Sequence, residues 1–386
     1  MNPAHRLLVI VLCNCVLILS GAHISWAQGP LVPPGPPAPM FKTLNQVEPR
    51  IPISPSDLPL TITAAGSYYL TQSIAYSTPN SNAIMITAGH VSIDLMGFTL
   101  QGPGHATGST GSAIVTTGTT PANLSISNGV ITEWRKNGID LTSYGENSEI
   151  KNIRVQAVGN RGIAAGPFNS IENCMVEFCG DAGIFCGNSS IIANCLSYKN
   201  ENGGLSISVG SYVRNSKIAA NTGIGIFSPV GSIITDTVVT DSTDNGIQTG
   251  RNSLVDNCFV STNSGAGIVV DFYCTVNGCT SLNNLGDAIQ GTFQNRITSN
   301  NCTNNGIGNG GAGIHMSVGC TISDNNVTAN AIGIKVDGAS NFIVRNNALG
   351  NAAQNYLLDT PSNIVGPIAT GLGTIFTTSP WANFSN

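Results

Sequence analysis

Charged side chains are scarce in this chain. Only 9% of its 386 residues are Asp, Glu, Lys or Arg, and aromatic residues make up 6%. Amphipathic helices need many charged residues on their solvent faces, so ordinary helical architectures are disfavoured. Hydrophobic residues make up 41% of the chain, too many for an intrinsically disordered protein. With 45 glycines as well, the composition predicts a globular, β-rich protein.

Basic residues are too few for a nucleic-acid-binding protein. The 15 Lys and Arg are outnumbered by 20 Asp and Glu, which gives a formal net charge of -5. No basic face is available to attract a phosphate backbone, so we expect no nucleic-acid partner.

The first 27 residues have the pattern of a secretory signal peptide. Arg6 precedes an apolar run from Leu7 to Leu19, and the small-residue exit Ser25-Trp26-Ala27 predicts cleavage after Ala27. An uncleaved anchor is disfavoured because the run is shorter than the ~20 residues that span a bilayer, and Asn14 interrupts it. We expect residues 1–27 to be removed, no transmembrane segment afterwards, and a secreted, periplasmic or cell-surface location.

Residues 28–56 are predicted to be a proline-rich linker, because proline at this density favours extended polyproline conformation over a packed core. The linker either holds the body away from a surface or is the disordered start of a freely secreted protein.

Nine cysteines follow the predicted signal, an odd number, so at least one is unpaired. They lack the CxxC pairs of zinc sites, and we expect most to be small buried hydrophobes, with no metal and no cofactor.

The dominant feature is a repeat of 21 residues. A small residue followed by an aliphatic one recurs in this register at Gly162-Ile163, Gly183-Ile184, Gly204-Leu205, Gly225-Ile226, Gly246-Ile247, Gly267-Ile268 and Ala288-Ile289. Less regular copies occur at Ile84, Ile114, Ile139, Ile314 and Ile334.

Further columns follow the same period. A β-branched column is Ile150, Ile171, Ile192, Val213, Ile234, Val255 and Val276, and a third column is Val155, Val176, Ile218, Val239 and Val260, interrupted by Ser197 and Ser281. Asn152, Asn173, Asn194, Asn215, Asp236 and Asn257 form an Asn column between them. Asn tolerates the left-handed conformation of a sharp bend, and its amide could hydrogen-bond to the amide of the next coil.

Each period therefore supplies three short strands, and stacked coils place identical columns about 4.8 Å apart. Leucine-rich repeats have a similar period but need several leucine columns, which this chain lacks. The sequence predicts an all-β solenoid of about a dozen coils, each of about 21 residues.

These columns resemble a right-handed parallel β-helix of the pectin-lyase-like superfamily, over most of the mature chain. The segments Gly66–Leu70, Val91–Leu100 and Pro380–Phe384 are similar to those of secreted bacterial right-handed β-helix repeat proteins, a largely uncharacterised group. The resemblance implies an all-β right-handed parallel β-helix.

Solenoids expose their core at both ends unless something covers it. We expect an N-terminal cap at residues 57–80, with Tyr68, Tyr69 and Leu70 as plugs, then the β-helix at 81–355. A C-terminal cap at 356–386 would use Trp381 and Phe384.

In that superfamily the active groove usually lies on the outward face of the strand that begins at Gly-Ile. The outward column here is Ala164, Phe185, Ser206, Phe227, Gln248, Val269, Gln290, His315 and Lys335, which is mostly inert. The paired acids of polygalacturonase-like hydrolases are incomplete here. The clustered Asp ligands and Arg base of calcium-dependent pectate lyases and the DPHD signature of alginate epimerases are absent.

Reactive side chains concentrate near the C-terminal coils. His315, Lys335 and Asp337 are the candidate catalytic residues, as base, charge neutraliser and acid for proton abstraction beside a uronate carboxylate. Gln290 and Asp271 are candidate substrate-binding residues beside them. The alternative is a solvated face near the end of a solenoid.

Trp134, in the Glu133–Lys136 loop, is the remaining candidate substrate-binding residue, because an exposed indole can stack on a sugar ring. The alternative is that Trp134 packs against the solenoid wall. Met175, Leu196, Val238 and Phe259 form an outward apolar stripe on the third strand, which either docks a partner or is covered by a neighbouring segment.

The poor supply of charge on the usual catalytic face favours a non-catalytic extracellular protein that is structural or contacts a carbohydrate. Its expected partner is an extracellular polysaccharide or cell-surface glycan. The alternative is a polysaccharide lyase or epimerase that acts on uronic-acid polymers through His315, Lys335 and Asp337.

Overall fold

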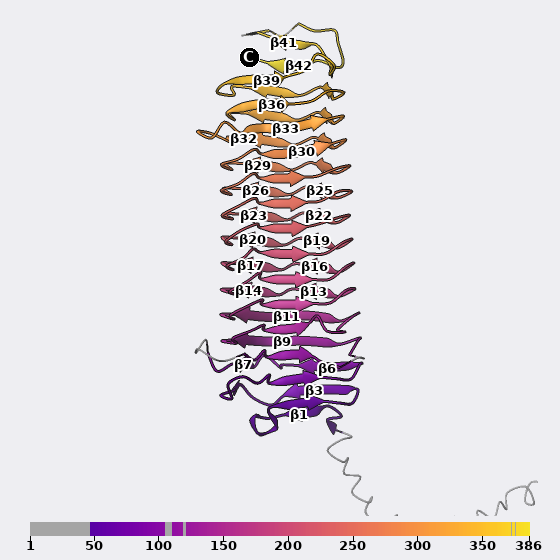
Figure 1. Ribbon diagram of the computed structural model, residues 1–386, viewed down its shortest axis with the longest axis vertical. Coiled ribbons are helices and arrows are strands. Elements are labelled where there is room, and N and C mark those ends of the chain that lie inside the picture. The colour runs from indigo at the N-terminus through magenta and orange to yellow at the C-terminus, as the bar shows by residue number, and fades with distance from the viewer. Residues whose placement is uncertain (1–46, 105–109, 119–120, 372, 375) are drawn as a thin grey trace, which may run out of the picture. The chain divides into compact units, whose positions relative to one another are not determined.

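The 21-residue repeat folds as coils of three short strands. A computed structural model describes residues 47–104, 110–118, 121–371, 373–374 and 376–386. The predicted signal peptide and residues 28–46 of the predicted linker lie outside the described residues. Within residues 50–386 the coils follow one another in sequence order, so each strand pairs in parallel with its equivalent in the next coil (Figure 1).

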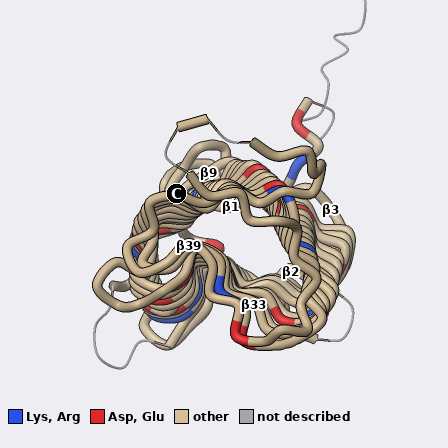
Figure 2. The backbone as a smooth tube through the Cα atoms, turned by 90° about the horizontal axis from the view of Figure 1, so that it is seen from above, with Lys and Arg blue, Asp and Glu red and all other residues tan. Residues whose placement is uncertain are grey.

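The predicted aliphatic columns form the core. Ile184 pairs with Leu205 and Leu205 with Ile226, in one vertical file. All three are at most 1% exposed, and the β-branched and third columns are equally buried. Seen from above, the coils superpose (Figure 2). The predicted all-β parallel solenoid is confirmed.

One sheet has 14 strands, each from a successive coil, and the described residues form about 15 turns rather than about a dozen. Its strands are β2 (Leu60–Ile62), β5 (Ile84–Ile86), β8 (Ile114–Thr116), β10 (Ile139–Leu141), β12 (Ile163–Ala165), β15 (Ile184–Cys186), β18 (Leu205–Ile207), β21 (Ile226–Ser228), β24 (Ile247–Thr249), β27 (Ile268–Val270), β30 (Ile289–Phe293), β33 (Ala312–Val318), β36 (Ile332–Val336) and β39 (Gln354–Leu358).

The other strands form two ribbons of one 28-stranded sheet. The first ribbon contains β1 (Ile51–Ile53), β3 (Gly66–Leu70), β6 (Val91–Asp94), β13 (Ser170–Glu172), β16 (Ile191–Ala193), β19 (Tyr212–Arg214), β22 (Ile233–Thr235), β25 (Leu254–Asp256), β28 (Thr275–Asn277), β31 (Arg296–Thr298), β34 (Thr321–Ser323), β37 (Phe342–Val344) and β40 (Ile364–Val365).

The second ribbon contains β4 (Ile74–Ala75), β7 (Thr99–Gln101), β14 (Met175–Glu177), β17 (Leu196–Tyr198), β20 (Lys217–Ala219), β23 (Val238–Thr240), β26 (Phe259–Ser261), β29 (Thr280–Leu282), β32 (Asn301–Thr303), β35 (Asn326–Thr328), β38 (Asn347–Leu349), β41 (Ile368–Thr370) and β42 (Asn383–Ser385). The longer strands β9 (Ser125–Thr132) and β11 (Glu149–Gln156) run through both ribbons. One 3-10 turn, Pro55–Asp57, follows β1.

The predicted Asn column occupies the bend between the two ribbons. Its members have positive φ angles, for example 54° at Asn173 and 56° at Asn194, as a left-handed bend requires. The continuous amide ladder, however, runs through a different, buried column. Asn263 donates from Nδ2 to Oδ1 of Asn284 at 2.9 Å, and Asn284 donates to Asn305 at 3.0 Å. Because buried amides need hydrogen-bond partners, those of the interior column pair with one another from coil to coil.

The serines that interrupt the third column are fully satisfied. Ser197 donates to the Gly204 carbonyl at 2.8 Å and accepts from Asn200 at 3.0 Å. Ser281 makes the equivalent bonds: it donates to the Ala288 carbonyl and accepts from Asn284. A buried hydroxyl therefore replaces an aliphatic side chain without an unpaired polar group.

The N-terminal boundaries differ from the prediction. Residues 51–53, assigned to the linker, form β1 and pair in register with β3. The predicted cap at 57–80 is itself the first coil, because β2, β3 and β4 pair with β5, β6 and β7. Tyr68 and Leu70 are buried there, whereas Tyr69 is half-buried under Arg50.

The C-terminal boundary is also shifted. Strand β39 crosses the predicted limit at residue 355 and continues the 14-stranded sheet. Trp381 is 50% exposed and packs edge-on to Phe342, so it covers the side of the first ribbon rather than the end of the core. Phe384 pairs with Asn347 through β42, which extends the second ribbon.

All nine cysteines that follow the predicted signal are free and buried, as expected for small core residues. Burial raises the pKa of Cys179 and of Cys186 to about 12, so both thiols stay protonated at neutral pH. Among the described residues, none of the helical segments has the length and apolar character needed to span a bilayer.

Ile226→Asp should be severely destabilising. Ile226 is 0% exposed, so its loss removes roughly 2–5 kcal/mol of packing and adds an unpaired buried charge. Val269→Asp, two coils further along on an outward position of the same sheet, should be mild. Thermal denaturation of both variants checks this, and equal losses in melting temperature would refute the assigned facing.

Gly225→Ala should also destabilise the coil. A Cβ on Gly225 would lie 2.5 Å from the Gly246 carbonyl oxygen and 2.5 Å from Cγ1 of Val239. Such overpacking costs about 1–3 kcal/mol. Gly371→Ala, where a Cβ meets nothing within 4 Å, is the control in urea unfolding and should leave the midpoint unchanged.

Candidate functional site

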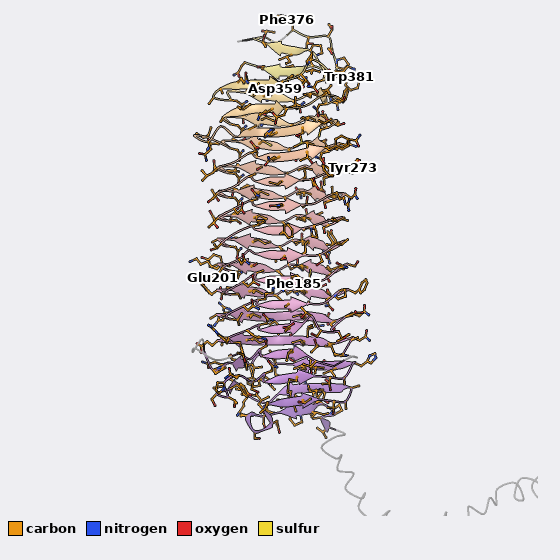
Figure 3. The ribbon with its side chains drawn as sticks, in the orientation of Figure 1. Phe185, Glu201, Tyr273, Asp359, Phe376 and Trp381 are labelled. Carbon is orange, nitrogen blue, oxygen red and sulfur yellow. The ribbon has the colours of Figure 1, made fainter. Side chains whose placement is uncertain are left out.

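The outward face of the 14-stranded sheet carries the column that sequence analysis singled out. Strand pairing places Gln290 beside His315 and His315 beside Lys335. Phe185 lies on this face (Figure 3). Ala164 is in register with Phe185 in the outward column but is buried, and the remaining members are half-buried or exposed.

His315 is held between two carboxylates. Its Nδ1 lies 2.9 Å from Oδ2 of Asp287, and its Nε2 lies 2.6 Å from Oδ2 of Asp337. Lys335 Nζ lies 3.2 Å from the other carboxylate oxygen of Asp337. We call Asp287, His315, Lys335 and Asp337 the ion cluster.

His315 faces outward even though its coil is longer than the 21-residue coils that precede it. Ile289 and Ile314 pair across 25 residues instead of 21. The additional residues form a turn at 306–310, where Gly306, Gly308 and Gly310 have positive φ angles. Because the insertion is confined to that turn, Ile314 and Met316 remain buried and His315 points out between them.

Asp287 is the member of the ion cluster that sequence analysis missed. It lies two residues before Ile289, at the position of Asn245 two coils earlier and of Asn137 near the start. Asn137 and Asn245 each accept a backbone N–H of the next coil, and Asp287 accepts that of Ala312 in the same way. Its second oxygen is thereby aimed at His315. An acid at the position where Asn137 and Asn245 bond to the next coil is the signal that could have identified it.

The two carboxylates raise the pKa of His315. The hydrogen bond from His315 to Asp287 is the largest cause, burial opposes it, and the bond to Asp337 adds to it. Burial acts to raise the pKa of Asp337, but hydrogen bonds from His315 and Lys335 outweigh it, so that pKa is lowered. Each ring nitrogen of His315 faces a carboxylate oxygen, and together with the raised pKa this geometry favours the imidazolium form, which donates both N–H groups. The lowered pKa of Asp337 favours its ionised form.

The members of the ion cluster satisfy one another. Two carboxylates are paired with one imidazolium and one ammonium, so their formal charges cancel. A group that takes a proton from a substrate must be unprotonated and within hydrogen-bond reach. His315 has no free ring nitrogen in this arrangement. Within the described part of the chain, no group of three or more His, Cys, Asp or Glu is placed to hold a metal ion.

A groove lies beside the ion cluster on the preceding coils. Phe227, Gln248, Val269, Asp271 and Thr292 line it, with a volume of about 410 Å³. Phe227 is 39% exposed, and Thr292 donates to Asp271 at 3.3 Å. We call it the sheet groove. Phe227 and Gln248 are neighbours in one outward column, and Asp271 lies two residues after Val269 of the same column, so the groove offers an aromatic ring, an amide and a carboxylate.

The structure separates the other predicted site residues. Asp271 lines the sheet groove, and Gln290 is exposed on the next coil, in register with His315. Trp134 is 0% exposed, stacks on Tyr76 with ring centroids 5.5 Å apart, and donates to the Leu100 carbonyl. The prediction of an exposed indole is wrong, because the early coils bury Trp134 in their core.

A family model described as a right-handed beta helix region matches residues 209–349. The match agrees with the coils described above, which form a parallel β-helix. A search of curated proteins gave no match.

Several solved structures are similar in fold. The A-module of the Azotobacter vinelandii mannuronan C-5 epimerase AlgE6 is 14% identical, with a TM-score of 0.49, over 78% of this chain and 90% of that one. The Agl-KA catalytic domain is 17% identical, with a TM-score of 0.49, over 80% of this chain and 62% of that one. The Dettilon tailspike protein is 16% identical, with a TM-score of 0.46, over 78% of this chain and 63% of that one. These likenesses concern the fold and carry no information about the site.

The ion cluster should stabilise the fold more at mildly acidic than at alkaline pH. Because the folded-state pKa of His315 is raised above ~6.5, its contribution is complete below that value and is lost as pH rises through the folded pKa. His315→Gln should cost roughly 1 kcal/mol at about pH 5.5, and the difference from the unchanged protein should shrink towards pH 9.

Thermal denaturation across this pH range measures the effect. His90→Gln is the matched control, because His90 is exposed and lies in the first coils, far along the chain from the ion cluster. A difference between His315→Gln and the unchanged protein that grows with pH would contradict the charged assignment.

Proposed function

We propose that this protein is a non-catalytic extracellular protein that contacts a polysaccharide through the outward face of its 14-stranded sheet. The binding surface is the sheet groove together with Gln290 of the following coil. The proposed location rests on the signal pattern of residues 1–27, which would direct the chain out of the cytoplasm.

The sheet groove suits a sugar chain. A sugar ring has an apolar C–H face that packs on an aromatic ring such as Phe227, and hydroxyls that exchange hydrogen bonds with Gln248 and Asp271. Gln248 and Gln290 lie in the same outward column, separated by Val269. The polar groups therefore follow the solenoid axis, as an extended polymer would.

The mutual saturation of the ion cluster carries the proposal that binding is not followed by turnover. His315 is the one histidine in the outward column, and both of its ring nitrogens are engaged by carboxylates. Lys335 is paired with Asp337. A substrate would have to displace these partners before any of the groups could act on it.

Phe227→Ala should weaken polysaccharide binding about tenfold, or ~1.4 kcal/mol, because an aromatic anchor is removed from the centre of the groove. Binding to a panel of immobilised plant, algal and bacterial polysaccharides measures this. Phe342→Ala is the matched control, since Phe342 is 37% exposed on β37, in the first ribbon.

If none of the polysaccharides binds, the contact proposal fails and a purely structural role remains. Equal losses with Phe227→Ala and Phe342→Ala would show that the sheet groove is not the binding surface.

A polysaccharide lyase or epimerase is the second candidate, and one observation favours it. His315, Lys335 and Asp337 meet within hydrogen-bond distance, as proton abstraction beside a uronate carboxylate requires. In such an enzyme the substrate carboxylate would replace Asp337 at Lys335 and free His315 Nε2.

Incubation with uronic-acid polymers distinguishes the two candidates. A lyase releases unsaturated products that absorb in the ultraviolet, and an epimerase changes the uronate composition seen by NMR. Turnover that is abolished in His315→Gln would establish the second candidate and overturn the first.

A further inference from the structure

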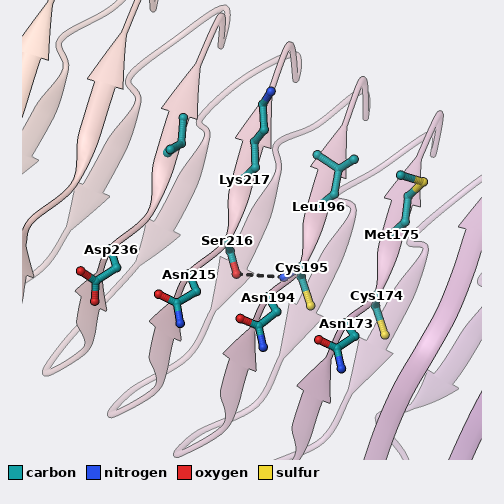
Figure 4. Close-up of a pocket in the computed structure, with 11 residues that line it drawn as sticks. Asn173, Cys174, Met175, Asn194, Cys195, Leu196, Asn215, Ser216, Lys217 and Asp236 are labelled. Atoms are coloured by element: carbon teal, nitrogen blue, oxygen red, sulfur yellow. Dashed lines mark hydrogen bonds between the residues drawn. The ribbon is translucent and has the colours of Figure 1, made fainter.

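A second groove follows the bend between the two ribbons, away from the 14-stranded sheet. It has a volume of about 620 Å³ and spans four consecutive coils. One wall is formed by the left-handed bend residues Asn173, Asn194, Asn215 and Asp236, and the other by the outward side chains Met175, Leu196, Lys217 and Val238. Figure 4 shows these two rows running side by side. We call this the bend groove.

The carboxamides of the bend groove have free hydrogen-bonding capacity. Elsewhere in the same column Asn152 donates to Asn128 at 3.0 Å, and at one end of the groove Asp236 accepts from Asn257 at 2.6 Å. Among the described residues, no hydrogen bond is made by the side chains of Asn173, Asn194 and Asn215. These three exposed amides therefore present donors and acceptors to the groove, one per coil.

The facing wall is apolar except for one cation. Met175, Leu196, Lys217 and Val238 are in-register neighbours on β14, β17, β20 and β23. Successive side chains are thus about 4.8 Å apart. Lys217 has no ion-pair partner among the described residues. Its ammonium interrupts the apolar stripe as an unneutralised charge.

This combination selects one class of ligand. Sugar rings offer C–H faces to Met175 and Leu196 and hydroxyls to the amides, while a ring carboxylate would neutralise Lys217. A peptide strand is disfavoured because the strands along the groove already pair on both sides, which leaves no backbone edge to extend. A nucleic acid is disfavoured by the single lysine and the net charge of -5.

We infer that the bend groove is a second polysaccharide-binding site, specific for an acidic chain whose carboxylate pairs with Lys217. The ligand runs parallel to the solenoid axis over the coils of β14, β17 and β20. This inference is independent of the sheet groove, and the two sites together would make the protein bivalent for polysaccharide.

Isothermal titration calorimetry at low ionic strength tests the inference, with oligogalacturonate and its carboxyl-reduced, neutral counterpart as probes. Lys217→Gln should weaken oligogalacturonate binding about tenfold and leave the neutral probe unchanged, because a charge-assisted bond is lost. Asn194→Gly should weaken both about fivefold. Glycine keeps the left-handed bend at this position without strain, so the variant removes only the carboxamide.

Two matched controls accompany these variants. Lys199→Gln removes another exposed lysine, at the bend that follows β17. Asn252→Gly removes another exposed left-handed asparagine, at the bend before β25. Neither should change binding, and all four variants should keep the melting temperature of the unchanged protein.

Oligogalacturonate binding that Lys217→Gln leaves intact would overturn the inference, as would equal binding of the neutral probe or equal losses with Lys199→Gln. Displacement of the oligosaccharide by an acidic peptide of equal charge would also overturn it. Phe227→Ala separates the two sites: a loss with Phe227→Ala alone supports only the sheet groove, and a loss with Lys217→Gln alone supports only the bend groove.

Discussion

Hydrogen bonding between coils is the constraint on which the rest of the structure depends. The backbone N–H and C=O groups of each strand pair with the equivalent strands of the neighbouring coils. The bends need partners as well, and buried side chains supply them. The backbone N–H of Asn263 donates to Oδ1 of Asn284, and Asn284 repeats the contact with Asn305. A shift of register would leave such buried amides unpaired, so each coil is fixed directly over its predecessor.

The fixed register determines which side chains meet on the surface. Residues that are 21 or 25 positions apart become neighbours, as Gln290 and His315 do. The ion cluster is a product of this geometry, because its four members come from three successive coils. The same geometry repeats any outward side chain along the axis. A solenoid with few charges therefore presents long, chemically uniform strips, and an extended polymer fits them better than a compact ligand.

The columns of the sequence were sufficient to predict the coil and its inside and outside. Ile226 and Ile247 are buried and Phe227 and Gln248 are not, as period and alternation require. Contacts made outside the columns were not predictable in this way. Asp287 reaches His315 of the next coil from a position that has no repeated residue type, and Trp134 is buried in the irregular early coils. The boundaries predicted for the two ends were wrong for a related reason. Strands β1 and β42 pair like the strands of ordinary coils, although their sequences lack the repeat.

The functional account depends on the charge state of one side chain. If His315 is an imidazolium held by Asp287 and Asp337, the outward face has no free histidine base, and contact without turnover follows. The ¹⁵N NMR shifts of the His315 ring, recorded at neutral pH on protein with labelled histidine and assigned by comparison with His315→Gln, test this directly. The account predicts that both ring nitrogens are protonated. One protonated and one unprotonated nitrogen would contradict it.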